Sequence, residues 1–273
     1  MLWRDRRELF DSFGRLRGRF VASARVTKRP IFVFFTTSVW PSEQVQAFLF
    51  DDDYSFGILQ SSAHWQWFLE KCSKLKSDFS YSIESVFDTF PWPQFAPVPG
   101  TPAAGARDGH ASGSAGVPPA GFRVPRKPPG VKQTPNETDG ATTSDVPGGT
   151  PATAGGTPAL PPEADIARIR AVAVAGREVR RIRAEALPKL KGGLRALYRT
   201  LELPGANPLK DAHAVLAAYG FSPKADLLAQ LLALNQTVAT RIARAEPVTA
   251  PGIPPAFPNP ETLVTEDCIR PGT

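Results

Sequence analysis

The sequence predicts an α+β protein, in which a mixed sheet-and-helix unit is followed by a disordered linker and a small all-α domain of helical hairpins. Three observations predict this class. Residues 1–95 combine many aromatic residues with short apolar runs of mixed period. Residues 96–162 contain 14 Pro and 12 Gly, which exceeds the ~25–30% share typical of low-complexity segments. Residues 163–245 return to helical apolar spacing, and the proline-rich residues 246–273 are expected to be extended.

The first unit is expected to begin with a short helix at Arg4–Leu16. Strands are predicted where apolar residues run or alternate between turn-forming residues. The predicted strands are Phe20–Val26, Ile31–Phe35, Val45–Phe50 and Tyr54–Leu59. A turn at Asp51–Asp53 precedes the last of them. Three aspartates in one tight run cannot surround an ion, so we expect a solvated turn there and not a metal site.

A helix is predicted to begin after Ser61 or Ser62, because a serine hydroxyl accepts hydrogen bonds from the free amides of a first helical turn. We expect this helix to run to about Leu75. The unit ends at Phe90–Pro93, where two prolines prevent a helix or a central strand from continuing.

Proline and glycine divide the later segment into three or four predicted helices, which we expect to pack as hairpins. The first has apolar residues on one face from Ile166 to Ala186. Asn207 and Ser222 each stand before a proline, a pattern typical of a helix start.

The composition suits an anionic partner such as nucleic acid, because the formal net charge is +6 and the isoelectric point is about 9.5. Cys72 and Cys268 are far apart, so neither a disulfide framework nor a structural zinc site is expected. No run approaches the roughly 20 apolar residues that span a bilayer, and the N-terminus lacks a secretory apolar region. We therefore expect a cytoplasmic protein with no membrane partner.

Basic residues concentrate in residues 1–29 and 163–245. Arg25, Lys28 and Arg29 lie between two predicted strands, and loops on rigid scaffolds often carry function, so we favour DNA contact for them. The arginines of the first later helix suit a solvated helix face and DNA contact equally; they are Arg168, Arg170, Arg177, Arg180, Arg181 and Arg183.

A second group of candidates follows the predicted helix at Ser61. In KLKSDFSYS, Lys74 and Lys76 lie on one side of an extended segment, which suits a row of phosphates, and Tyr81 follows them. An ordinary exposed loop is an equally good interpretation. His64 is a candidate for reading a base edge, although such a histidine more often caps or packs, and the neighbouring tryptophans Trp65 and Trp67 favour core positions.

Methyl transfer or hydrolysis by this chain alone is not expected. The sequence shows no strand–glycine turn–helix unit for S-adenosylmethionine, and no Asp/Asn-Pro-Pro-aromatic element of the kind that holds a flipped base. No nuclease, Ser/His/Asp or Cys/His set has a supporting context. We therefore assign no catalytic residue, no metal and no cofactor to this chain.

Five stretches of the first unit closely resemble the end of the target-recognition domain in MmeI-like DNA methyltransferases, which are type II restriction–modification proteins. They are Ser23–Phe32 (SARVTKRPIF), Asp52–Ser61 (DDYSFGILQS), His64–Phe68, Cys72–Lys76 (CSKLK) and Val86–Gln94 (VFDTFPWPQ). The helical part resembles the C-terminal helical domain of the same proteins. Its matching stretches are Leu194–Arg199 (LRALYR), Leu203–Leu209 (LPGANPL) and Val264–Ile269 (VTEDCI).

The resemblance implies that residues 1–95 are the C-terminal part of a DNA target-recognition domain. It implies double-stranded DNA as a partner and adenine-N6 methylation from S-adenosylmethionine in the intact family. It places Met1 inside the recognition domain, which implies a truncated gene product or one half of a split gene. In a split system a separate methyltransferase catalytic chain is a second partner. The alternative is a structural fragment that docks on such a subunit without binding DNA.

Overall fold

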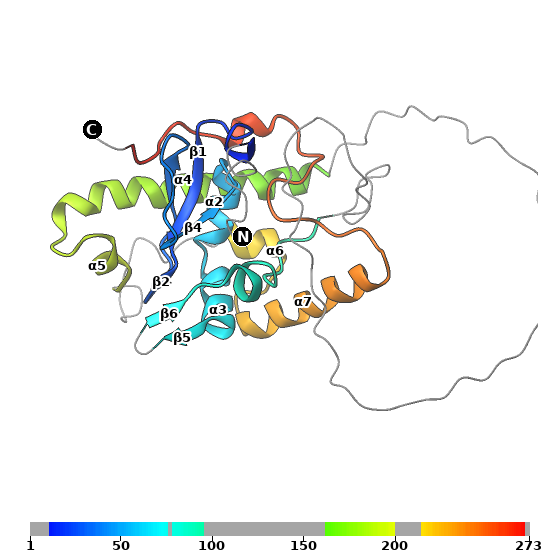
Figure 1. Ribbon diagram of the computed structural model, residues 1–273. Helices are drawn as coiled ribbons and strands as arrows, with labels where there is room; N and C mark the ends of the chain where they lie inside the picture. The colour runs from blue at the N-terminus through cyan, green and yellow to red at the C-terminus, as the bar shows by residue number, and fades with distance from the viewer. Residues whose placement is uncertain (1–10, 76–77, 96–161, 200–213, 271–273) are drawn as a thin grey trace, which may run out of the picture.

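The computed structural model describes residues 11–75, 78–95, 162–199 and 214–270. Two small antiparallel sheets lie against a set of helices, so the predicted α+β class is confirmed (Figure 1). The predicted linker falls almost entirely outside the described residues, as do residues 4–10 of the helix predicted at Arg4–Leu16. Residues 11–13 are helical. In the described parts of the chain, no helix is long and apolar enough to cross a bilayer.

The first sheet has the order β3-β1-β4, with β1 at Arg19–Ala24, β3 at Val33–Thr36 and β4 at Val45–Phe48. Val21 pairs with Phe34 on one side and Phe48 on the other, so these three side chains share one face and enter the main core. Phe20 and Ala22 point to the opposite face, where Phe13 covers them. Strands are therefore confirmed at the three ranges predicted before residue 51, with bounds that differ by up to two residues.

The second sheet, which we call the small sheet, has the order β2-β6-β5. Its strands are β2 (Val26–Thr27), β6 (Asp78–Ser80) and β5 (Ser73–Leu75). Phe79 of β6 pairs with Thr27 on one side and Lys74 on the other. Strands β2 and β6, which are more than fifty residues apart in the sequence, thus become neighbours.

The strand predicted at Tyr54–Leu59 is wrong, because Asp53–Leu59 forms the helix α2. Asp52 caps it and accepts a hydrogen bond from the amide of Ser55 at 2.7 Å. Every residue of α2 is buried, so the sequence carries no one-sided apolar period that would reveal a helix. A short run rich in apolar residues fits a buried strand equally well.

Helix α3 spans Ser62–Lys71, and Ser61 caps it as predicted by accepting from the amide of His64 at 3.2 Å. The helix ends four residues before the predicted Leu75. Cys72 is extended and the next three residues join the small sheet as β5. A π-helical turn, η1, follows at Ile83–Phe87.

Helix α4 (Glu163–Ala186) lies directly against α2 and behind the first sheet (Figure 1). Gly57 and Gly176 lie at the crossing. A Cβ added to Gly176 would lie 2.7 Å from the Asp53 carbonyl oxygen, and one added to Gly57 would lie 2.8 Å from the Val172 carbonyl oxygen. The two glycines therefore allow the backbones of α2 and α4 to approach more closely than side chains would permit.

The remaining elements are η2 (Leu187–Lys189), α5 (Gly193–Arg199), α6 (Ala214–Tyr219), α7 (Leu227–Ala243) and η3 (Pro260–Leu263). Buried residues of α4, α6, α7 and η3 join the aromatic residues of the first unit in one continuous core. The division at residues 95 and 163 into separate domains stays a prediction, but the hydrophobic core runs across it. The last described residues of the chain lie beside the first sheet, because Ile269 forms a parallel bridge to Phe35 of β3.

Candidate nucleic-acid interface

The small sheet gathers four of the seven residues predicted to contact DNA. Arg25 precedes β2, Lys28 and Arg29 follow it, and Lys74 lies in β5. Arg25, Lys28 and Lys74 are exposed, and Arg29 is partly exposed. Lys76, the partner predicted for Lys74, lies outside the described residues. The fold therefore brings a basic loop and a basic strand together around one sheet.

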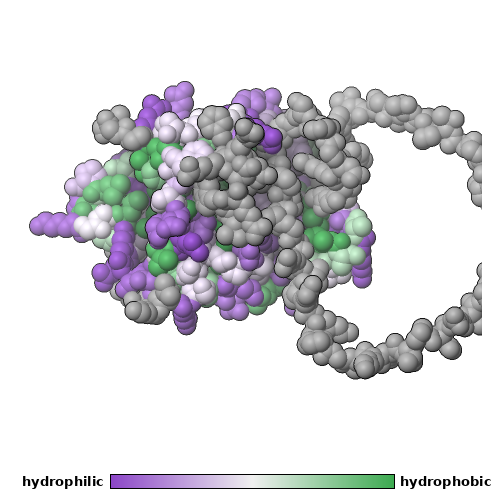
Figure 2. Space-filling view, viewed as in Figure 1, coloured by the Kyte–Doolittle hydropathy of each residue, from purple (hydrophilic) through white to green (hydrophobic). Residues whose placement is uncertain are grey.

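The space-filling view shows the surroundings of this sheet. Hydrophilic side chains protrude at the end of the molecule where the small sheet and α5 lie, between smaller hydrophobic areas (Figure 2). Arg25, Lys28 and Lys74 are exposed, so their side chains can contact solvent or a polyanion.

Arg29 is held more firmly than the other basic residues of the small sheet. Its guanidinium carbon lies 4.3 Å from the centroid of the Trp65 ring and 5.4 Å from that of Tyr198. The turn before it is also closed, because the Thr27 hydroxyl donates to the Arg29 carbonyl at 2.8 Å and accepts from the Arg29 amide at 3.3 Å. Backbone and guanidinium are thus both positioned.

His64 and Tyr81 are not at the surface, so their prediction as DNA contacts is corrected. Both side chains are fully buried, and the His64 Nε2 and Tyr81 hydroxyl lie 2.9 Å apart in a hydrogen bond. Burial lowers the pKa of His64 to about 3 and raises that of Tyr81 well above its usual value. The alternative interpretation, in which His64 packs inside the fold, is the one the structure supports.

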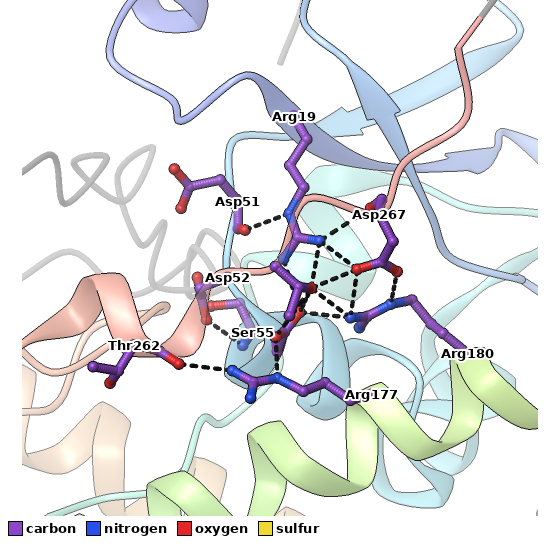
Figure 3. A network of polar contacts seen from close by, with 10 residues as sticks. Arg19, Asp51, Asp52, Ser55, Arg177, Arg180, Thr262 and Asp267 are labelled. Atoms are coloured by element: carbon purple, nitrogen blue, oxygen red, sulfur yellow. Dashed lines mark hydrogen bonds and ion pairs between the residues drawn. The ribbon is translucent and has the colours of Figure 1, made fainter.

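The arginines of α4 mostly bind partners within the protein. Asp53 is completely buried at the start of α2, and it receives Arg19 from β1 together with Arg177 and Arg180 from α4 (Figure 3). We call this set, together with Asp267 from the tail, the Asp53 hub. The Asp51–Asp53 turn was expected to be solvated, and that expectation is wrong for Asp52 and Asp53, whose exposed fractions are 3% and 0%.

The hub geometry uses both oxygens of the Asp53 carboxylate. Oδ1 accepts from Arg19 Nη2 at 2.7 Å and from Arg180 Nη2 at 2.8 Å, while Oδ2 accepts from Arg177 Nε at 2.5 Å. Arg180 Nε also donates to Asp267 Oδ2 at 2.5 Å. These charge-assisted bonds connect β1, α2, α4 and the tail at one point.

Asp52, next to the hub, has a different environment. Its side chain is buried and pairs with no arginine among the residues that the structure describes, and this burial raises its pKa to about 7 although the Ser55 hydrogen bonds oppose the shift. The carboxyl caps α2.

Arg183 and Arg181 of α4 also bind partners within the protein. Arg183 is 4% exposed, and its Nε donates to the Tyr198 hydroxyl at 2.7 Å while its Nη1 donates to the Phe32 carbonyl at 2.7 Å. Arg181 pairs with Glu178 and Glu185 on the exposed face of the same helix. Neither interpretation of this arginine run, a solvated face or a DNA contact, fits Arg180 and Arg183, which turn inward.

Sequence reasoning missed Trp65 and Tyr198 as partners of Arg29. Trp65 was assigned to the core, and it does stack on Phe68 with ring centroids 5.6 Å apart. Tyr198 belongs to α5, far along the chain, so no local pattern connects it with the loop after β2.

Comparison with known proteins gives three results. Residues 21–94 match the family model of the MmeI target recognition domain. A search of curated proteins finds no match. A solved structure of the Type IIL restriction–modification enzyme MmeI in complex with DNA is similar at 16% sequence identity and a TM-score of 0.46, over 82% of this chain and 22% of that one. The chain thus spans about a fifth of the length of that enzyme. The matched residues 21–94, which include the small sheet, α2 and α3, are therefore similar to a target recognition domain of the MmeI type.

Proposed function

We propose that this chain recognises double-stranded DNA in a sequence-specific manner, as part of a restriction–modification system. The observation that carries the proposal is the placement of Arg25, Lys28, Arg29 and Lys74 around one sheet of the segment that matches a target recognition domain. Cations placed this way release counterions from DNA phosphates, while neighbouring polar groups read base edges.

The proposal includes a division of labour. Methyl transfer from S-adenosylmethionine to adenine N6 would be carried out by a separate methyltransferase catalytic chain, which this chain positions on its site. In that arrangement the DNA sequence that this chain recognises determines which adenine is methylated. This chain's contribution would be measured as binding and not as turnover.

The test is duplex binding by the full chain across a salt series. Three phosphate contacts, by Arg25, Lys28 and Lys74, predict a slope of log affinity against log salt near −2.7, from ~0.9 per phosphate on B-form DNA. That slope corresponds to a loss of roughly 40-fold in affinity between 50 and 200 mM salt. Enrichment of a random duplex library would then show whether one sequence is preferred.

Matched variants sharpen this test. Lys28→Ala and Lys74→Ala each remove one proposed phosphate contact, so each is expected to reduce the salt slope by about one. Lys224 is equally exposed but lies in the loop before α7, so Lys224→Ala should leave the slope unchanged. If all three variants changed affinity equally, net charge and not the small sheet would be responsible for binding.

A folded protein that binds no duplex even at low salt would refute the proposal and favour docking on a methyltransferase subunit. One observation fits that second candidate, since Val174 is 61% exposed on the outer face of α4. A pull-down of the methyltransferase subunit by the full chain, with Val174→Lys as the variant expected to lose it, would test that docking.

A further inference from the structure

We propose that the DNA-contact surface extends beyond the small sheet onto residues 187–199, which form η2 and α5 and which we call the η2–α5 segment. In this proposal the four cations of the segment bind phosphates of the same duplex. They are Lys189, Lys191, Arg195 and Arg199. The inference rests on the proposed DNA-recognition function, and it adds a second contact surface outside the residues that match the recognition-domain model.

The first support is the charge of the η2–α5 segment. All four cations are exposed, and the segment contains no acidic residue. Among the residues that the structure describes, none forms an ion pair with these cations, whereas the exposed Arg181 of α4 pairs with both Glu178 and Glu185. Like charges four residues apart on a helix repel, so Arg195 and Arg199 do not stabilise α5 through their charges. Such a group of cations suits an external polyanion.

The second support is the direction of the cations. Leu190 is extended and partly buried, so Lys189 and Lys191 on either side of it point to the same side of the chain. Arg195 and Arg199 are four residues apart in α5, so they share one exposed face of that helix. The segment therefore presents its cations as two pairs, each of which suits a row of phosphates.

The third support is the position of the segment beside the small sheet. The ring centroid of Tyr198 in α5 lies 5.4 Å from the guanidinium carbon of Arg29, which follows β2. The buried Arg183 donates both to the Tyr198 hydroxyl and to the Phe32 carbonyl, and so connects α5 to the chain that continues from β2. Hydrophilic side chains protrude at this end of the molecule (Figure 2). One duplex lying along this end can therefore contact both surfaces.

The first experiment is the salt series with the full chain. The three contacts of the small sheet alone give a slope near −2.7, whereas seven contacts would steepen it to about −6, from ~0.9 per phosphate. A double variant, Arg195→Ala with Arg199→Ala, should reduce the slope by about two. Between 50 and 200 mM salt its affinity should therefore fall roughly tenfold less than that of wild type. Alanine favours a helix, so α5 is expected to form in this variant.

The matched control removes the same number of charges elsewhere. Lys224→Ala with Arg244→Ala replaces two exposed cations, one before α7 and one at its C-terminal end. This control should leave the slope unchanged. The α5 variant should weaken binding to the selected duplex and to a scrambled one by the same factor, because phosphate contacts carry no sequence information. An equal fall in slope for the control would assign the effect to net charge and overturn the inference.

A second experiment tests contact with individual phosphates. Single phosphates of the selected duplex are replaced in turn by uncharged methylphosphonates. Wild type should lose affinity at two separate groups of positions, one for each surface. The α5 double variant should be insensitive at one group, and Lys28→Ala with Lys74→Ala should be insensitive at the other.

The outcomes distinguish this inference from the proposed function. A wild-type slope near −2.7, together with an α5 double variant that binds like wild type, would overturn the inference and leave recognition by the small sheet in place. The same conclusion follows if the α5 variant keeps its duplex binding but no longer captures the methyltransferase subunit, because its cations would then bind that protein. A folded wild-type chain that binds no duplex would remove both proposals.

Discussion

The Asp53 hub predicts a large difference between two substitutions that remove the same charge. Asp53 is completely buried, and its partner Arg19 has a side chain only 2% exposed, whereas Asp267 is 54% exposed. Replacing Asp53 by Asn keeps the shape but leaves Arg19 in the core without its buried counterion. Removing one member of a buried pair costs about 3–5 kcal/mol.

Asp267→Asn is the matched control, because Asp267 binds Arg19 and Arg180 as Asp53 does. An exposed ion pair contributes about 0–1 kcal/mol, so this variant should be close to wild type. With a urea dependence of about 2 kcal/mol per molar, Asp53→Asn should lower the unfolding midpoint by roughly 1.5–2.5 M. Asp267→Asn should lower it by about 0.5 M or less.

The assay is urea unfolding followed by circular dichroism and tryptophan fluorescence, with coincident transitions as the check for two-state behaviour. Equal midpoints for the two variants would refute the reasoning, because burial would then not determine how much each aspartate of the hub contributes to the free energy of unfolding. A double replacement, Arg19→Met with Asp53→Leu, should recover part of the loss, since an apolar pair of similar volume leaves no buried charge.

Three further predictions concern the core around the site. Gly176→Ala should destabilise the protein by several kcal/mol in the same urea assay, because the new methyl group would lie 2.7 Å from the Asp53 carbonyl oxygen. Asp52→Asn, which keeps the helix cap, should gain stability over wild type as pH rises, by roughly 2–3 kcal/mol between pH 5 and pH 8. Tyr81→Phe should cost about 1–3 kcal/mol, because it leaves the buried ring of His64 without its hydrogen-bond partner, and should not change the salt slope of duplex binding.

The sign of the Asp52 prediction follows from its raised pKa. The folded state holds the proton up to about pH 7, whereas an unfolded aspartate loses it near 3.8. Stability from this group is therefore full below pH 3.8 and is lost as pH rises through 7. A gap between variant and wild type that does not widen with pH would show that Asp52 is not buried as a neutral acid.

Controls for the other two substitutions lie in the same elements. Ala171 is on the exposed face of α4, so Ala171→Val should cost about 1 kcal/mol or less. Gly176→Ala with the same small effect would mean that α2 and α4 can separate without loss of stability. For Tyr81→Phe, a changed salt slope with unchanged stability would indicate that Tyr81 contacts DNA.

Much of the fold could be predicted from local patterns. The strands at β1, β3 and β4 alternate or run apolar residues between turns, and Ser61 has the cap chemistry that starts α3. Helix α4 was found from its apolar face, because its outer side stays in solvent. Helices α3 and α4 each have one exposed side, and that side makes the helical period visible in the sequence.

The errors share a physical cause, which is burial on all sides. Helix α2 is buried on every side, so its apolar residues show no one-sided period in the sequence. Asp53 looks like a surface turn residue in sequence, since its three arginine partners are supplied by β1 and by α4. His64 and Tyr81 are seventeen residues apart, and their shared burial depends on how β6 packs on α3. Such contacts arise from tertiary packing and leave no local signal.

The position of Asp267 has a consequence for how the protein forms during synthesis. Among these residues Arg19 and Asp53 are synthesised first, Arg177 and Arg180 follow more than a hundred residues later, and Asp267 and the Ile269 bridge to β3 come after them. Until then the buried pair of Arg19 and Asp53 lacks its further ion-pair partners. The first unit is therefore expected to stay open to proteases and chaperones until residue 267 has been synthesised, so that a chain that stops before this point is degraded.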